Sequence, residues 1–158
     1  MPNRPEMQID TTARYRVTIT TDKGDIVLEL DPSIAPVTVN NFVALARQGY
    51  YDGLTFHRVE PGFVIQGGCP EGSGRGGPGY KFEDEPVQGD YALGAVAMAN
   101  AGPDTNGSQF FICLDDLAGR LPKQYNLFGR TVEGIDVVQS IRRGDVMRTV
   151  AVEELPAG

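Results

Sequence analysis

The chain has 158 residues, of which 41% are hydrophobic, so it is long enough to bury one core and is expected to form a single domain. Its formal net charge of −7 argues against a nucleic-acid partner, because a phosphate backbone is bound by clustered Lys and Arg. No apolar segment has the length of a membrane span or the form of a secretory signal, so a cytoplasmic protein without a membrane partner is expected.

The first third of the sequence predicts an arm, a hairpin and a helix. Residues 1–13 are predicted to form a polar, poorly ordered arm, and residues 14–158 the folded domain. Apolar residues alternate in "YRVTIT" and in "DIVLEL", and the intervening "TDKG" predicts a β-hairpin. Pro36 then opens a run with apolar residues at intervals of three, four and seven, and Gly49 follows it, which is typical of an amphipathic helix.

The rest of the chain reads as short strands with one more helix. "LTFHRV" and "FVIQGG" are joined by a turn, "GAVAMA" and "QFFICL" flank the loop "NAGPDTNGS", and "YNLFGRTV" and "MRTVAVEEL" follow. Between the last two, "EGIDVVQSIRR" predicts a short helix. Seven or eight strands in hairpin order favour a closed antiparallel β-barrel capped by two helices over a doubly wound parallel sheet.

A glycine-rich stretch, "GCPEGSGRGGPG", contains the spacing G-x-G-x-x-G at Gly72, Gly74 and Gly77. In a dinucleotide-binding fold this motif follows a strand and opens a helix. Here Pro78 and "GYKFEDEP" follow, without helical periodicity. A nucleotide-binding enzyme is therefore the weaker alternative, and the glycines are expected to form a compact surface loop with positive backbone dihedrals.

Metal and covalent chemistry have little support in the sequence. The two cysteines, Cys69 and Cys113, and the single histidine, His57, form no ligand motif, so no metal and no cofactor are expected. Two free thiols are expected rather than a disulfide. We interpret His57 as structural, because neither an acid nor a nucleophile accompanies it in the sequence.

Two runs carry candidate chemistry. In "FHRVEPGFVIQGG" an arginine and a glutamine lie on neighbouring predicted strands beside phenylalanines, which is typical of a small-ligand or peptide site. A solvated arginine on a strand is the plainer alternative. In "MANAGPDTNGSQFFI" a polar loop joins two apolar strands, and its backbone groups could pair with an extended peptide.

These two runs, together with "KFEDE" and "LFGRTVEGIDVV", resemble in order and spacing the cyclophilin family of peptidyl-prolyl cis–trans isomerases. The resemblance covers about residues 15–153 and is strongest to bacterial single-domain members. It implies an eight-stranded antiparallel barrel capped by two helices, with the active site on the outer face of the barrel.

The resemblance also implies roles for individual residues. Arg58 matches the catalytic arginine, which would stabilise a twisted amide without a covalent step. The residues that would bind the substrate are Phe63, Val64, Gln66, Ala99, Asn100, Ala101, Phe111, Leu121 and Tyr125. Gly72, Thr105 and Asn106 would border a neighbouring pocket for the residues that precede the proline.

The implied partners are proline-containing peptides and unfolded proteins, bound by a monomer. The family often has "WLDGKH" where this chain has "RLPKQY", and the chain contains no Trp, so weaker cyclosporin binding is expected than in Trp-containing members. A proline-peptide scaffold or chaperone without turnover is the alternative, although the presence of Arg58 favours activity.

Overall fold

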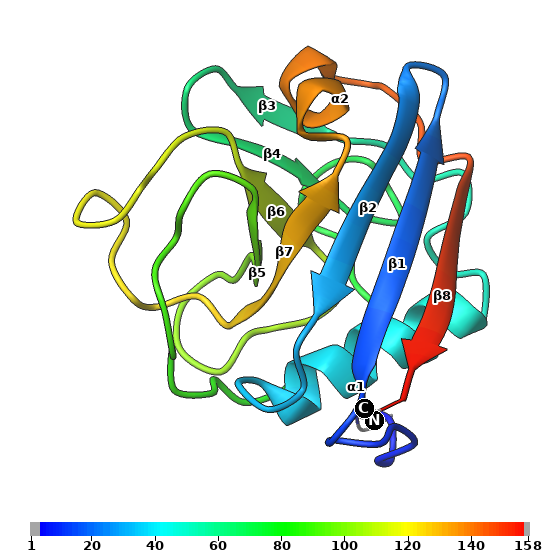
Figure 1. Cartoon of the computed structure of the whole chain (residues 1–158), viewed down its shortest axis with the longest axis vertical. Coiled ribbons are helices and arrows are strands. Elements are labelled where there is room, and N and C mark those ends of the chain that lie inside the picture. Colours follow the sequence, from blue (N-terminus) through cyan, green and yellow to red (C-terminus); the bar gives the residue numbers. More distant parts are fainter. Residues whose placement is uncertain (1–3, 157–158) are drawn as a thin grey trace.

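The structure, a computed structural model, describes residues 4–156 as one antiparallel sheet with two helices (Figure 1). The strands are β1 (Arg14–Thr21), β2 (Gly24–Leu30), β3 (Arg58–Glu60), β4 (Val64–Gly67), β5 (Ala95–Met98), β6 (Phe110–Cys113), β7 (Leu127–Glu133) and β8 (Thr149–Leu155). The helices, α1 (Pro36–Arg47) and α2 (Ile135–Ser140), lie at opposite ends of the sheet. Within the described residues no helix could cross a membrane.

The predicted hairpin forms β1 and β2, with Tyr15 opposite Leu30 and Thr21 opposite Gly24. Every second residue of β1 is buried, as the alternation in its sequence indicates. β8 pairs with the other side of β1, so the first and last strands lie side by side (Figure 1). β1 therefore has a strand partner on each side, although it stands at the start of the domain.

The strand order is β3-β4-β6-β5-β7-β2-β1-β8, so β3 and β8 are the two edges of the sheet. These edges do not pair as strands. The segments beside them share one bridge, Thr55 to Val146, and hydrogen bonds such as Phe56 N–H to the Asp145 carbonyl at 2.9 Å. Eight antiparallel strands and two helices are confirmed, whereas the expected closed barrel is not, because irregular backbone and a three-residue β3 replace a continuous ladder between the edges.

The main core lies between the inner face of the sheet and α1. Phe42 of α1 stacks on Tyr51 with ring centroids 4.8 Å apart and meets Phe110 edge-on at 5.4 Å. All three rings are fully buried, as are Tyr15 and Phe128. Loss of one such ring typically costs about 3–5 kcal/mol, so this aromatic group fixes α1 against the sheet.

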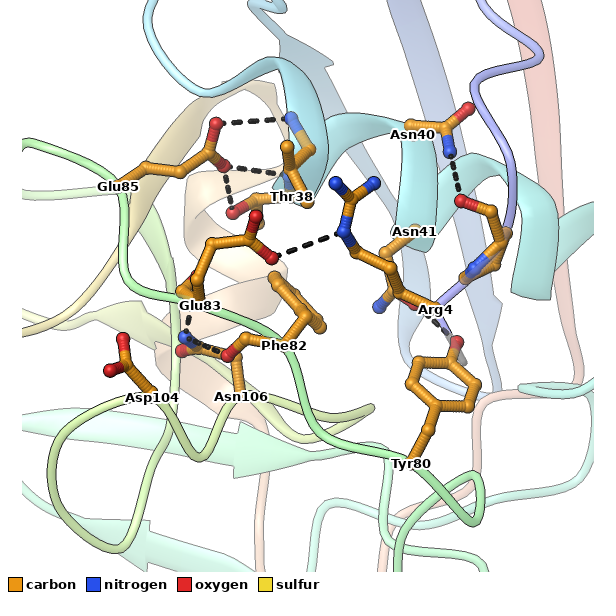
Figure 2. Close-up of polar contacts among 12 residues, drawn as sticks. Arg4, Thr38, Asn40, Asn41, Tyr80, Phe82, Glu83, Glu85, Asp104 and Asn106 are labelled. Carbon is orange, nitrogen blue, oxygen red and sulfur yellow. Dashed lines mark hydrogen bonds and ion pairs between the residues drawn. The ribbon is translucent and has the colours of Figure 1, made fainter. Parts of the chain in front are cut away.

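A distant carboxylate caps the N-terminus of α1. Ala35 stands at the N-cap and offers no side-chain acceptor. Instead, Glu85 accepts hydrogen bonds from the backbone N–H groups of Val37, at 3.0 Å, and Thr38, at 2.8 Å, and from the Thr38 hydroxyl (Figure 2). Because the N–H groups of a first helical turn lack partners within the helix, this contact satisfies the helix and attaches the 80–85 segment to it.

The described part of the N-terminal arm lies against α1. Asn40 accepts a hydrogen bond from the Gln8 N–H at 2.8 Å and donates one to the Glu6 carbonyl at 2.9 Å. Arg4 forms an ion pair with Glu83 at 3.1 Å (Figure 2). Residues 4–8 are thereby joined both to α1 and to the segment that caps it.

Gly134 and Gly119 offer a matched test of close backbone packing. Both have φ near +80° (+82° and +77°), and a Cβ at Gly134 would overlap the Asp25 carbonyl oxygen, whereas a Cβ at Gly119 has nothing within 4 Å. We expect Gly119→Ala to cost about 1–2 kcal/mol from the left-handed backbone alone, and Gly134→Ala about 3 kcal/mol or more. Urea unfolding of both variants measures the difference. Equal losses would contradict the packing of Gly134 on β2.

Candidate functional site

The outer face of the sheet presents a cross-strand row of candidate residues. Arg58 on β3 lies opposite Gln66 on β4, Gln66 lies opposite Phe111 on β6, and Phe111 lies opposite Ala97 on β5. Directly opposite residues project from the same face of a sheet. Their chain neighbour Ile65 projects inward and is fully buried in the main core. Strand pairing thus brings together side chains that are up to 53 positions apart (111 − 58).

A second apolar cluster covers part of this outer face. Its buried members are Val64, Tyr91, Ala95, Ala97, Phe111, Cys113, Leu117 and Leu127. The 115–126 segment packs over them, held by a hydrogen bond from the Leu117 N–H to the Tyr91 carbonyl at 2.7 Å and by one from the Tyr91 hydroxyl to the Tyr125 carbonyl at 2.6 Å. The Phe111 and Tyr125 rings meet edge-on at 5.5 Å. This cluster gives the outer face a firm apolar floor.

A small pocket opens on that floor, with a volume of about 140 Å³. It is lined by Arg58, Phe63, Val64, Gln66, Ala99, Asn100, Phe111, Leu121 and Tyr125. These are all the residues named from the sequence as catalytic or substrate-binding except Ala101. An apolar cavity of about 150 Å³ accommodates one benzene ring, so the small pocket has the size for a single small ring.

Arg58 lies at the mouth of the small pocket with 47% of its side chain exposed. Its Nη1 donates to Gln66 Oε1 at 3.2 Å, and its Nε lies 3.5 Å from Glu60 Oε1. The guanidinium carbon is 6.0 Å from the centre of the Phe63 ring. Among the described residues Nη2 has no hydrogen-bond partner, so its N–H groups are available to a bound molecule.

Gln109 connects the small pocket to the glycine-rich loop. It accepts a hydrogen bond from Gln66 Nε2 at 3.1 Å and donates from Nε2 to the carbonyls of Gly74, at 2.9 Å, and Gly76, at 3.0 Å. Gln109 is not among the site residues expected from the sequence. The sequence feature that could have pointed to Gln109 is its place directly before the apolar run "FFIC", where a polar side chain needs a hydrogen-bond partner.

The glycine-rich loop, residues 68–79, is organised around a thiol. Cys69 Sγ accepts the backbone N–H groups of Gly74 and Gly76, each at 3.3 Å. Burial raises the pKa of Cys69, but backbone N–H groups directed at the sulfur, among them those of Gly74 and Gly76, outweigh burial, so the pKa lies below its usual value. Burial alone raises the pKa of Cys113 to about 12, and both thiols are free. No helix opens at this loop, so it lacks the context of a dinucleotide-binding motif.

A large pocket of about 800 Å³ adjoins the small one and shares Gln66, Ala99 and Asn100 with it. Its other lining residues are Gly74, Arg75, Gly76, Gly77, Pro78, Gly79, Tyr80, Lys81, Ala101, Thr105, Gly107, Ser108 and Gln109. The glycine-rich loop forms one wall of the large pocket, and the loop after β5 forms another.

The residues expected at the neighbouring pocket fall in different places. Thr105 lines the large pocket, and so does Ala101, whereas Gly72 and Asn106 do not. Asn106 is fully buried, and its amide donates to the Phe82 carbonyl at 3.1 Å (Figure 2). Its side chain therefore holds the 80–85 segment rather than lining the pocket.

The backbone of Asn100 is open to a ligand. Its side chain is engaged, since Nδ2 donates to the Gln124 carbonyl at 2.9 Å and Oδ1 accepts the Gly102 N–H at 3.2 Å. Within residues 4–156 its backbone N–H and C=O have no hydrogen-bond partner. Since Asn100 lines both pockets, an extended peptide crossing from one to the other could pair with it.

The described part of the chain contains no group of three His, Cys, Asp or Glu side chains that could hold a metal ion. What the site offers is a guanidinium with free N–H groups, a pocket of one ring's size with aromatic and polar walls, and an open stretch of backbone. These groups suit the binding and polarising of an extended chain.

Comparisons with known proteins agree with this geometry. Residues 16–155 match the family described as "Cyclophilin type peptidyl-prolyl cis-trans isomerase/CLD". Peptidyl-prolyl cis-trans isomerase B of Bacillus subtilis is 50% identical over 134 residues, which are 84% of this chain and 93% of that protein. A peptidyl-prolyl cis-trans isomerase of Helicobacter pylori is 47% identical over 137 residues, with 84% and 83% covered.

A solved structure shows the same fold. The cyclophilin-type isomerase of Cryptosporidium parvum, crystallised in the presence of the dipeptide Ala-Pro, matches with a TM-score of 0.80 and 34% identity, covering 87% of this chain and 98% of that one. Since the family match spans the sheet, both helices and both pockets, this chain belongs to the cyclophilin-type peptidyl-prolyl cis–trans isomerases.

Proposed function

We propose that this isomerase binds proline-containing chains with the proline ring in the small pocket and Arg58 beside the prolyl nitrogen. The observation that carries the proposal is a cation with free N–H groups beside a pocket of one ring's size whose walls include Phe63 and Phe111. The crystal of the Cryptosporidium parvum relative with Ala-Pro supports the choice of proline.

The reaction needs an environment that favours a twisted amide. Amide resonance sets a barrier of about 20 kcal/mol to rotation about an X-Pro bond. Twisting breaks the resonance, and the prolyl nitrogen regains a lone pair that the planar ground state does not have. A hydrogen bond from Arg58 Nη2 to that lone pair would form only near the transition state, so it would lower the barrier rather than only tighten binding.

The contacts of Arg58 support this role. Gln66 and Glu60 hold Nη1 and Nε, so the guanidinium keeps its orientation while Nη2 remains free. Phe63 and Phe111 would grip the ring from the pocket walls. The open backbone of Asn100 would hold the preceding residues while the carbonyl on the other side of the bond rotates.

A general base has no place in this mechanism, because no proton is transferred. His57 is half-buried and lies under the glycine-rich loop. Its Nε2 is so close to Gly74 that a Cβ at that glycine would lie only 3.5 Å from it. Burial lowers the pKa of His57, and the positive charges of Arg58 and Arg143 add to the effect. The imidazole is therefore neutral at pH 7.

We further infer that the protein acts as a monomer on proline-containing peptides and unfolded proteins in the cytoplasm. Both pockets are built from a single chain, so a second copy is not needed to complete either. Two free, buried thiols suit a reducing compartment.

Arg58→Ala is expected to lower kcat/KM about thirty- to a thousandfold, which corresponds to about 2–4 kcal/mol of transition-state stabilisation. Most of the loss should fall on kcat, since the hydrogen bond forms only as the nitrogen pyramidalises. Arg58→Lys should also lose activity. A planar guanidinium can donate to Gln66 through one nitrogen and to the prolyl nitrogen through another, and a single ammonium group cannot hold both positions. Cis–trans exchange of an Ala-Pro peptide, followed by NMR, measures both variants.

Two controls make the Arg58 experiment decisive. Thermal unfolding should show little change, because Arg58 is exposed on the outer face. Glu60→Gln, which alters a contact to Nε but not Nη2, should retain most activity. A folded Arg58→Ala variant with activity within threefold of wild type would exclude the proposed role, and binding without accelerated exchange in the wild type would favour a scaffold.

His57→Gln should keep kcat/KM within about twofold of wild type, with no step between pH 6 and pH 8 in either protein. The lowered pKa also affects folding stability, because the folded state favours the neutral imidazole. The stability that His57 contributes is therefore fully present above the pKa of the unfolded state. It is lost as pH falls through the pKa of the folded state. Rate profiles from pH 6 to pH 8 test the first statement, and urea unfolding of both proteins from pH 8 to below pH 6 tests the second. A wild-type step in rate that disappears in the variant would indicate a base.

Cyclosporin should bind more weakly than it does to Trp-containing members of the family. In "RLPKQY" Arg120 stands where "WLDGKH" has Trp, and it lies 3.5 Å from Asp115 rather than lining the small pocket. Arg120→Trp, which supplies an indole N–H and a large ring, is expected to tighten binding. Calorimetric titration of wild type and variant checks this, and equal affinity would mean that the substitution is unimportant.

A further inference from the structure

The large pocket carries positive charge in an otherwise acidic protein. Arg75 and Lys81 line it, and no acidic side chain is among its lining residues. Both side chains are exposed, and neither forms an ion pair with any residue from 4 to 156. The two cations of this pocket are therefore opposite in sign to the net charge of the whole chain, which is −7.

Both cations project from backbone that is tied to the scaffold. The carbonyls on either side of Arg75 accept hydrogen bonds from Gln109. The tyrosine before Lys81 donates its hydroxyl to Asn41 of α1, and the phenylalanine after it pairs through its backbone with Asn106 (Figure 2). Anchored segments lose less conformational freedom when their side chains bind a ligand.

An extended peptide would bring one particular side chain to these cations. Side chains of an extended chain alternate between faces, so the second residue before a proline points to the same side as the proline ring, about 7 Å along the chain. The two pockets share Gln66, Ala99 and Asn100, so they lie within such a step. Of the three residues that the family resemblance places on the side preceding the proline, Thr105 lines the large pocket.

We propose that the large pocket selects a carboxylate side chain, Glu or Asp, at the second position before the proline, and that Arg75 and Lys81 bind it. The proposal rests on the isomerase function proposed above. A carboxylate can accept two parallel hydrogen bonds from a guanidinium and a further one from an ammonium group. Glu83, an acidic neighbour of Lys81 in sequence, is already paired with Arg4 and leaves the ammonium free.

The test uses peptides of the form Ac-Xaa-Ala-Pro-Ala-Yaa-NH2, with Glu or Gln at one position and Ala at the other. Exchange is followed by NMR without a coupling protease. At low ionic strength Glu at Xaa should give a kcat/KM about three- to tenfold above Gln, mainly through KM. The advantage should shrink in 0.5 M salt, where exposed charges are screened over a few ångströms. Glu at Yaa should give no advantage.

Variants assign the effect to the two cations. In the double variant Arg75→Gln, Lys81→Gln the Glu-to-Gln ratio should fall to about one. Arg130 lies on β7, outside both pockets, and serves as the control. Arg130→Gln removes one positive charge, as Arg75→Gln or Lys81→Gln does alone. It should leave the rates for the Glu and the Gln peptide, and their ratio, unchanged. Equal rates for Glu and Gln in the wild type, a ratio that survives in the double variant, or a preference only at Yaa would overturn the proposal.

A separate readout distinguishes this proposal from the isomerase function itself. Exchange accelerated equally for all peptides would sustain isomerisation and exclude the charge preference. If no peptide were isomerised, the proposed function would fail. The ratio of the dissociation constants of the Glu and Gln peptides, from amide shifts of residues 74–81, would then decide the charge preference alone.

Discussion

The pairing register of β3, β4 and β6 determines where the cross-strand row of the site lies. Arg58, Gln66 and Phe111 form one row on the outer face because Ile65 and Ile112, one residue away, are buried on the inner face. A slip of one residue would turn both isoleucines toward solvent and the polar row into the core. The burial of apolar side chains on the inner face thus aligns the guanidinium, the amide and the aromatic ring on the outer face. Interactions among these three groups are not needed to set the register.

The rims of both pockets are loops, and specific side chains hold each of them to the scaffold. Gln109 ties the glycine-rich loop to Gln66, and Glu85 ties the 80–85 segment to the first turn of α1. A binding surface built from loops loses affinity when the loops must be ordered by the ligand. Here hydrogen bonds to a helix and a sheet provide that order in advance, and α1 supports the site without touching either pocket.

Local patterns predicted most of the fold, whereas contacts between distant segments were harder to predict. The hairpin, both helices and the later strands follow from periodicity within ten or so residues. The two edges of the sheet meet only through irregular backbone at 53–56 and 144–147, which has no periodic signature. The lining of the small pocket followed from the family resemblance, except that Ala101 lies in the large pocket. The role of Gln109 could not be predicted, because its partners are backbone carbonyls of the glycine-rich loop, far from it in the sequence.

The pairing of β1 with both β2 and β8 bears on how the chain can fold during synthesis. β1 is synthesised before every other strand of this sheet, yet its second neighbour is formed by residues 149–155. Contacts of such large sequence separation form slowly, because a long loop must close before they contribute. Until the last strand emerges, one side of β1 presents unpaired N–H and C=O groups beside apolar side chains such as Val17 and Ile19. An unpaired edge of this kind associates readily with other strands, so the nascent domain is exposed to aggregation from the synthesis of β1 until that of β8.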